Sequence, residues 1–166
     1  AFDLLIDAGP LTEAAQDAAE TYAALLDAWQ IAYPPPILAT AAAMLCEAPP
    51  EPRRRAVEQC HAVVEHWRAH LRRCQADRVL IAAPIALSCD GDEPVAEVDR
   101  VEQFRDALCD HGLMRQPETL WSAALLRQRG VPRKRLGRVH EMWKALVTGG
   151  WSMGQSTYPH AARLAL

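Results

Sequence analysis

The chain has 166 residues and a formal net charge of −3, with half of its residues hydrophobic and 23% charged. A chain of this length usually forms one domain and buries roughly 70% of its unfolded surface, and this composition excludes an intrinsically disordered chain. No apolar run approaches the ~20 residues that a membrane-spanning helix needs. Alanine is abundant and β-branched residues are comparatively few, which favours helices.

The cysteines and the N-terminal residues indicate a cytoplasmic protein. The five cysteines, at positions 46, 60, 74, 89 and 109, form no C-x-x-C pair. Their odd number and wide spacing predict free thiols in a reducing compartment rather than disulfides or a zinc site. Residues 1–7 lack basic side chains and include aspartates, so no signal peptide is expected there.

The charge falls in blocks of alternating sign. Residues 1–50 contain seven acidic residues and no lysine or arginine, whereas residues 51–79 contain seven arginines against four acids. Residues 80–112 contain eight acids against two arginines, and residues 113–166 contain nine basic residues against two acids. A basic final third points to an anionic partner. The alternative is that acidic and basic blocks face each other within the fold.

A first amphipathic helix is predicted after Pro10, with Thr12 as its N-cap. Its apolar residues recur at spacings of three and four, the period of one helix face. They are Leu11, Ala15, Ala18, Tyr22, Leu25, Trp29 and Ala32. The run Tyr33-Pro34-Pro35-Pro36 is expected to stop the helix, because proline donates no N–H and disfavours a helical residue before it.

Two further helices are predicted before residue 79. A short alanine-rich helix spans 37–46, and a stiff proline-containing connector follows at 48–52. The next helix has an apolar face that we expect to pack against the first helix, and an opposite arginine face. The apolar face comprises Val57, Cys60, Val64, Trp67, Leu71 and Cys74, and the arginine face Arg53, Arg54, Arg68, Arg72 and Arg73.

Residues 79–87 form an apolar run that periodicity alone assigns neither to helix nor to strand. Pro84 argues against a central strand, so a buried helix is predicted. After a loop at 88–94, a helix is predicted at 95–109 and ends near Gly112, a residue suited to the C′ position. Its apolar face consists of Val98, Val101, Phe104 and Leu108.

Residues 113–150 are predicted to contain a pair of helices. The first spans 118–129 and stops at Gly130, and Pro132 fits the first turn of the second. Gly149-Gly150 ends the second helix. Its apolar face consists of Leu136, Val139, Trp143 and Leu146.

This pair resembles a helix-turn-helix. In that family a glycine in the turn is followed by an apolar residue, and apolar residues recur six and nine positions after the glycine. The matching residues here are Gly130, Val131, Leu136 and Val139, with Leu125 five positions before the glycine. Leu126 and Arg129 depart from the pattern, since the family prefers a small and an apolar residue there. The segment therefore fits either a helix-turn-helix with an altered crossing angle or an ordinary helical hairpin.

The resemblance implies a nucleic-acid interface in the second helix, whose N-terminal residues enter the major groove in this family. Four cations, Arg133, Lys134, Arg135 and Arg138, are expected in its first two turns, where a phosphate would relieve their opposition to the helix dipole. Arg127 and Arg129 would position the nucleic-acid backbone. The family usually binds paired half-sites, so a homodimer is an open alternative to a monomer.

The sequence thus predicts an all-α bundle of about six to seven helices with a C-terminal helix-turn-helix-like pair. One domain is expected over 1–166, organised as a bundle (1–112), the paired segment (113–150) and a tail (151–166). The expected function is non-catalytic nucleic-acid binding, with no catalytic group, metal or cofactor and no membrane association. The alternatives are an adaptor for an acidic protein partner and an enzyme of unknown class. In the adaptor, Trp151, Met153 and Tyr158 of the tail are exposed anchors; otherwise the tail folds back and these residues cover the open end of the bundle.

Overall fold

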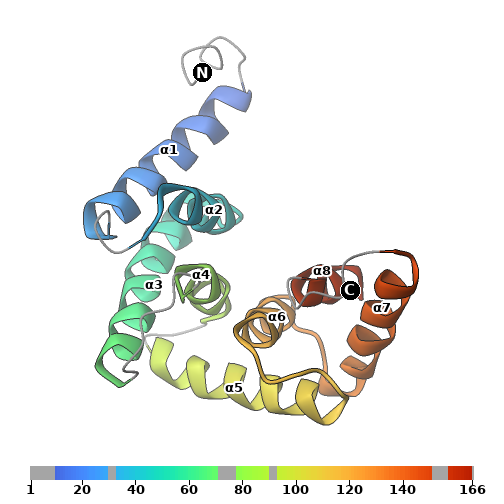
Figure 1. Ribbon diagram of the computed structural model, residues 1–166. Coiled ribbons are helices and arrows are strands. Elements are labelled where there is room, and N and C mark those ends of the chain that lie inside the picture. Colours follow the sequence, from blue (N-terminus) through green and yellow to red (C-terminus); the bar gives the residue numbers. More distant parts are fainter. Residues whose placement is uncertain (1–9, 30–32, 71–77, 90–92, 151–156, 166) are drawn as a thin grey trace. The chain divides into compact units, whose positions relative to one another are not determined.

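The computed structural model describes residues 10–29, 33–70, 78–89, 93–150 and 157–165. Every regular element in these ranges is helical, which confirms the predicted all-α class (Figure 1). The described elements are α1 (Pro10–Trp29), α2 (Pro35–Leu45), α3 (Pro50–His70), α4 (Arg78–Ser88), α5 (Pro94–Asp110), α6 (Pro117–Gln128), the 3-10 turn η2 (Arg133–Arg135), α7 (Gly137–Thr148) and α8 (Tyr158–Leu164).

Contacts between residues divide the chain into two compact units, Ala1–Leu87 and Ser88–Leu166. The first unit contains α1 to α3 and nearly all of α4, and the second contains α5 to α8. The expected grouping of 1–112, 113–150 and 151–166 within a single domain stays a prediction. Each unit is described below by itself.

In the first unit, α1 packs against α2 and α3, which confirms the predicted contact between the first and third helices. Leu25 and Trp29, from the predicted apolar face of α1, are buried. The Trp29 ring stacks on His61 of α3, with 5.2 Å between the ring centroids. Tyr33 is also buried, with its ring centroid 5.9 Å from that of Trp29. Aromatic packing therefore joins the end of α1 to α3.

Prolines that were expected to form connectors instead begin helices. Helix α2 begins at Pro35 and α3 at Pro50, so the predicted stop at 33–36 and connector at 48–52 extend too far. The first-turn N–H groups of a helix have no intrahelical acceptor, so proline loses nothing there. The same reason corrects the predicted cap of α1, because Pro10 begins the helix and Thr12 lies inside it. Ala32, Leu71, Arg72, Arg73 and Cys74 lie outside the described residues.

Helix α4 confirms the helical interpretation of residues 79–87. Its residues from Arg78 to Ala86 are all buried, and Pro84 lies in its interior. An interior proline normally costs about 3 kcal/mol, which the burial of this apolar helix offsets. Within the described part of the chain, no helix combines the length and the apolarity needed to cross a membrane.

The second unit is built on contacts of α6 with α5 and α8, and of α7 with α8. All four residues of the predicted apolar face of α5 are buried. Gly112 has φ +97° at the C′ position of α5, as predicted. The N–H of Leu113 bonds the carbonyl of Leu108 at 3.2 Å, which completes a Schellman cap.

The tail folds back as α8, an element that the sequence pattern did not predict. Tyr158 is only 1% exposed, so its expected role as an exposed anchor is wrong. Its ring meets that of Trp143 of α7 at 5.5 Å between centroids, and the Trp143 Nε1–H donates to Thr157 Oγ1 at 3.1 Å. These contacts join α8 to α7. Trp151 and Met153 lie outside the described residues.

Candidate nucleic-acid interface

The turn after α6 begins with a second Schellman cap. Gly130 has φ +65° and its N–H bonds the Arg127 carbonyl at 2.9 Å, while the N–H of Val131 bonds the Leu126 carbonyl at 3.0 Å. A residue in this left-handed region is most easily glycine, because a Cβ would crowd the following carbonyl. Gly130 therefore ends α6 as predicted.

The three consecutive cations after the turn do not belong to the second helix. Arg133, Lys134 and Arg135 form η2, and α7 begins only at Gly137. Pro132, predicted in the first turn of a helix, is the N-cap of η2 in an extended conformation. The predicted placement of four cations in the first two turns of the second helix is therefore wrong for three of them. Leu136, which is fully buried, separates η2 from α7.

Arg127 is held by a carboxylate on α5. Its Nε and Nη2 lie 2.9 and 2.8 Å from the same oxygen of Glu97, whose side chain is 2% exposed. Arg100 bonds the other oxygen of Glu97 at 2.9 Å. A guanidinium engaged in this way would have to break a buried ion pair before contacting a phosphate, which is costly.

Arg133 is exposed but is engaged with the surface of α5. Its Nη2 donates to Gln103 Oε1 at 3.1 Å, and its guanidinium carbon lies 5.5 Å from the centroid of the Phe104 ring. The guanidinium carbon of Arg127 lies at the same distance from that ring. Both arginines therefore make a cation–π contact with Phe104, whose side chain is buried. Arg133 therefore fastens η2 to α5.

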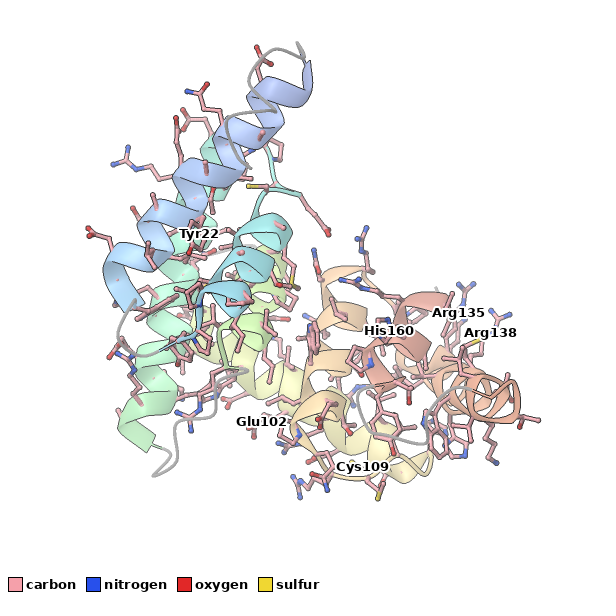
Figure 2. The ribbon with its side chains drawn as sticks, turned by 45° about the horizontal axis from the view of Figure 1, so that its top comes forward. Tyr22, Glu102, Cys109, Arg135, Arg138 and His160 are labelled. Atoms are coloured by element: carbon pink, nitrogen blue, oxygen red, sulfur yellow. The ribbon has the colours of Figure 1, made fainter. Side chains whose placement is uncertain are left out.

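The remaining predicted cations differ in whether their side chains have interaction partners. Lys134, Arg135 and Arg138 are exposed, and their side chains make no ion pair or hydrogen bond within the described residues. We call these three residues the basic cluster; Figure 2 labels Arg135 and Arg138, whose guanidinium groups extend away from the ribbon. Arg129, at the C-cap of α6, is exposed but has an interaction partner of its own.

The packing of the second unit differs from the close helix pair that the sequence resemblance implies. Helices α6 and α7 are not among the extensively packed pairs, whereas α8 packs against both. Leu125, Leu136 and Val139, which match the family's apolar positions, are buried. Val131, the other matching position, is only partly buried, and the helix-turn-helix resemblance stays a prediction. The sequence contains no motif that predicts α8, because a helix of seven residues is too short to show a clear apolar period.

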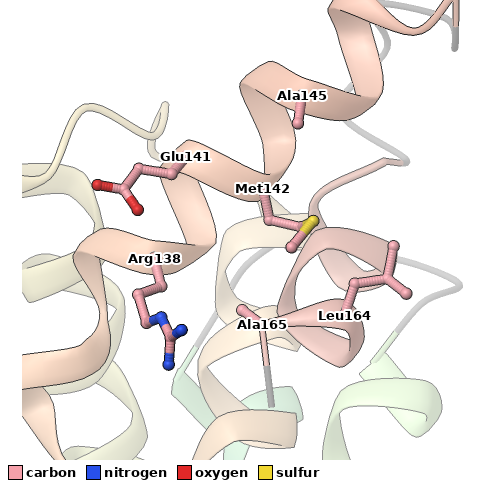
Figure 3. A pocket seen from close by; sticks show the side chains of 6 residues that line it. All are labelled: Arg138, Glu141, Met142, Ala145, Leu164 and Ala165. Atoms are coloured by element: carbon pink, nitrogen blue, oxygen red, sulfur yellow. The ribbon is translucent and has the colours of Figure 1, made fainter.

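A pocket of about 400 Å³ lies beside the basic cluster, between α7 and the end of α8 (Figure 3). Arg138 and Glu141 supply its charged atoms. Its other lining residues are Met142, Ala145, Leu164 and Ala165. Leu164 is 58% exposed, so the pocket has an apolar edge open to solvent.

No family model matches the chain, and comparisons with curated proteins and with solved structures gave no match either. The function is therefore argued from the residues themselves. Among the described residues, no three potential ligands come together to hold a metal ion.

Proposed function

We propose that the chain binds nucleic acid, without catalysis, through the basic cluster formed by Lys134, Arg135 and Arg138. The observation that carries the proposal is that these cations are exposed and unpaired within the described residues. Exposed cations gathered on η2 and the first turn of α7 create a local positive potential that attracts polyanions. Arginine also suits bidentate contact with phosphate.

The pairing of the other cations supports this choice. Arg105 and Arg115 of the second unit both bond Asp106, and Arg127 bonds Glu97. The acidic block at 80–112 thus neutralises an arginine within it and two arginines of the basic block that follows it, which is the alternative that the charge blocks left open. The basic cluster belongs to the part of the final third that no ion pair neutralises within the described residues.

The proposal includes a cytoplasmic location and leaves the homodimer to be measured. The four described cysteines are free thiols, as a reducing compartment would keep them. Size-exclusion chromatography with light scattering, with and without duplex DNA, determines whether the complex contains one copy or two.

A triple variant tests the proposal directly. Replacing Lys134, Arg135 and Arg138 with alanine should weaken binding to a fluorescent 20-base-pair duplex or an RNA hairpin about tenfold or more, because counterion-releasing contacts are lost. The melting temperature should not change, since no described contact is removed.

The matched control removes the same charge from other surfaces. Arg54, Arg68 and Arg115 are exposed and lie outside the basic cluster. Their triple alanine variant should retain most of the affinity if the cluster is the interface. The proposal fails if the unmodified protein retains neither DNA nor RNA at about 50 mM salt, or if both triple variants lose affinity equally.

A second candidate function, docking of an acidic protein helix, is favoured by the pocket between α7 and α8. An apolar side chain of the partner would contact Leu164 and Met142, and a carboxylate would pair with Arg138. Because Glu141 lines the same pocket and repels negative charge, the partner's carboxylate would lie on the side of Arg138. Charge complementarity with Arg138 is the reason for choosing an acidic helix.

A synthetic acidic amphipathic helix is the probe for this candidate. Its binding, followed by NMR shifts of α7 and α8, should be lost in Leu164→Asp and retained in Lys134→Ala. Binding of DNA should show the opposite response to these two variants. Failure of the peptide to shift any resonance of α7 or α8 would exclude the candidate.

A further inference from the structure

We infer that the basic cluster contacts phosphates and not base edges, so that the protein binds duplex DNA irrespective of its sequence. This inference rests on the proposed function and specifies how that function is carried out. Phosphate contacts set register and affinity but carry no sequence information, whereas base-edge contacts in the grooves do.

The first reason is where the cations stand. A helix-turn-helix reads bases with the N-terminal residues of a helix inserted in the major groove. Lys134 and Arg135 lie on the 3-10 turn η2 before α7, and only Arg138 lies in the first turn of that helix. Cations displayed on a short surface turn reach the phosphate backbone of a duplex without insertion of the helix.

The second reason is that two of the arginines predicted at the interface are already occupied. Arg127 forms a hydrogen-bonded ion pair with Glu97, and Arg133 donates to Gln103 and makes a cation–π contact with Phe104. A bidentate contact with guanine needs a guanidinium edge that is free to donate two parallel hydrogen bonds. Of the cations predicted at the interface, those of the basic cluster make no ion pair or hydrogen bond within the described residues, and they lie beyond both occupied arginines in sequence.

The third reason is the surface of α7 itself. After Arg138, the residues of α7 that face the pocket are Glu141, Met142 and Ala145 (Figure 3). A carboxylate close to a phosphate backbone is repelled by it, and neither methionine nor alanine carries a side-chain hydrogen-bond donor. Helix α8 also packs against α7, which commits another part of its surface to the fold.

The inference predicts a particular salt dependence. Three cations that each neutralise one phosphate give a slope of log K against log salt of about −2.7 for duplex DNA. Raising the salt from about 50 to about 200 mM should therefore weaken binding roughly 40-fold. Each single alanine variant of Lys134, Arg135 or Arg138 should reduce the steepness of the slope by about one.

The experiment measures binding of the full chain to two unrelated 20-base-pair duplexes and selects ligands from a randomised duplex pool. The expected result is equal affinity within about twofold, a slope near −2.7 and no enriched sequence. Enrichment of a consensus that binds more than about tenfold tighter than the unselected pool would overturn the inference and leave nucleic-acid binding standing. Absence of binding to every duplex and to RNA would instead overturn the proposed function.

Discussion

Arg127 donates a hydrogen bond from Nε to one oxygen of Glu97, and its Nη2 lies 2.8 Å from the same oxygen, although 30 residues separate the two residues in the chain. The other oxygen of Glu97 accepts a hydrogen bond from Arg100. This bond raises the pKa of the Arg100 guanidinium above its usual value. Ser88 Oγ also lies 3.4 Å from Glu97. These partners compensate the charge of the buried Glu97 carboxylate, which would be costly to bury alone. Its contact with Arg127 joins α5 to α6.

Replacement of Glu97 with alanine should destabilise the protein by about 3 kcal/mol, because it removes the buried carboxylate that joins α5 to α6 and leaves the partly buried Arg127 guanidinium without its partner. Urea unfolding followed by tryptophan fluorescence measures the loss. Glu102→Ala is the matched control on the same helix, since Glu102 is 44% exposed and lies 3.7 Å from Arg105. That control should cost less than about 1 kcal/mol. Equal losses in the two variants would contradict a structural role for the Glu97 pair.

Two glycines at helix ends should tolerate alanine differently. Gly130 has φ +65° and open space around it, so Gly130→Ala should cost about 1 kcal/mol from backbone strain alone. Gly112 has φ +97°, and a Cβ there would lie 3.0 Å from His140 Cε1, which should add roughly 1 kcal/mol.

Thermal unfolding of the single variants and of Gly112→Ala combined with His140→Ala separates the two costs. The excess cost at Gly112 should vanish in the double variant, because the clashing imidazole is gone. An excess that persists without His140 would place its origin in the backbone instead.

His140 should make the protein less stable at mildly acid pH. Burial, followed by the positive charge of Lys144 and by His111, lowers the pKa of His140, while Glu141 acts in the opposite direction. An unfolded histidine titrates near pH 6.5, so below that pH the unfolded state binds the proton more readily than the folded state does. The free energy of unfolding should therefore fall as the pH drops below about 6.5, and level off below the folded pKa.

Urea unfolding between about pH 7.5 and 5 measures this dependence. His140→Gln should remove part of it, whereas His160→Gln, at an exposed position, should leave it intact. An unchanged pH dependence in His140→Gln would show that other groups cause it.

Cys60 should be inert while the protein is folded. Its side chain is fully buried in α3, and burial raises the pKa of the thiol to about 12, so almost no thiolate forms at neutral pH. Iodoacetamide at about pH 8 should modify the half-buried Cys89 well before Cys60, as read by peptide mass spectrometry. In denaturant the two should react at similar rates. Prompt modification of Cys60 in the folded protein would contradict its burial.

The predicted apolar faces agree closely with the structure where the local pattern was strong. The apolar face of α5 is buried as expected, and Gly112 and Gly130 end their helices with positive φ. The errors at Pro35 and Pro50 share one cause, because a proline that stops one helix also suits the first turn of the next. At Thr12 the predicted cap is wrong because the helix begins two residues earlier, at Pro10. Helix α8 was not predicted because its seven residues are too few to show a repeating apolar pattern.

The candidate site was predicted only as a set of residues. The sequence predicts that Arg127 and Arg133 lie at a nucleic-acid surface. In the structure, Arg127 donates to Glu97 and Arg133 donates to Gln103. Each of these contacts spans 30 residues, and no local spacing rule identifies a partner at that separation. Lys134, Arg135 and Arg138 remain as the proposed interface.

The amino-acid sequence alone determined the helical class, the apolar face of α5 and the ends of several helices. These properties depend on backbone hydrogen bonds and side-chain periods within a few residues. Only the tertiary structure decided which cations of the final third remain available and that α8 packs on α6 and α7. Ion pairs depend on distances through space, and these exist only after the helices have packed.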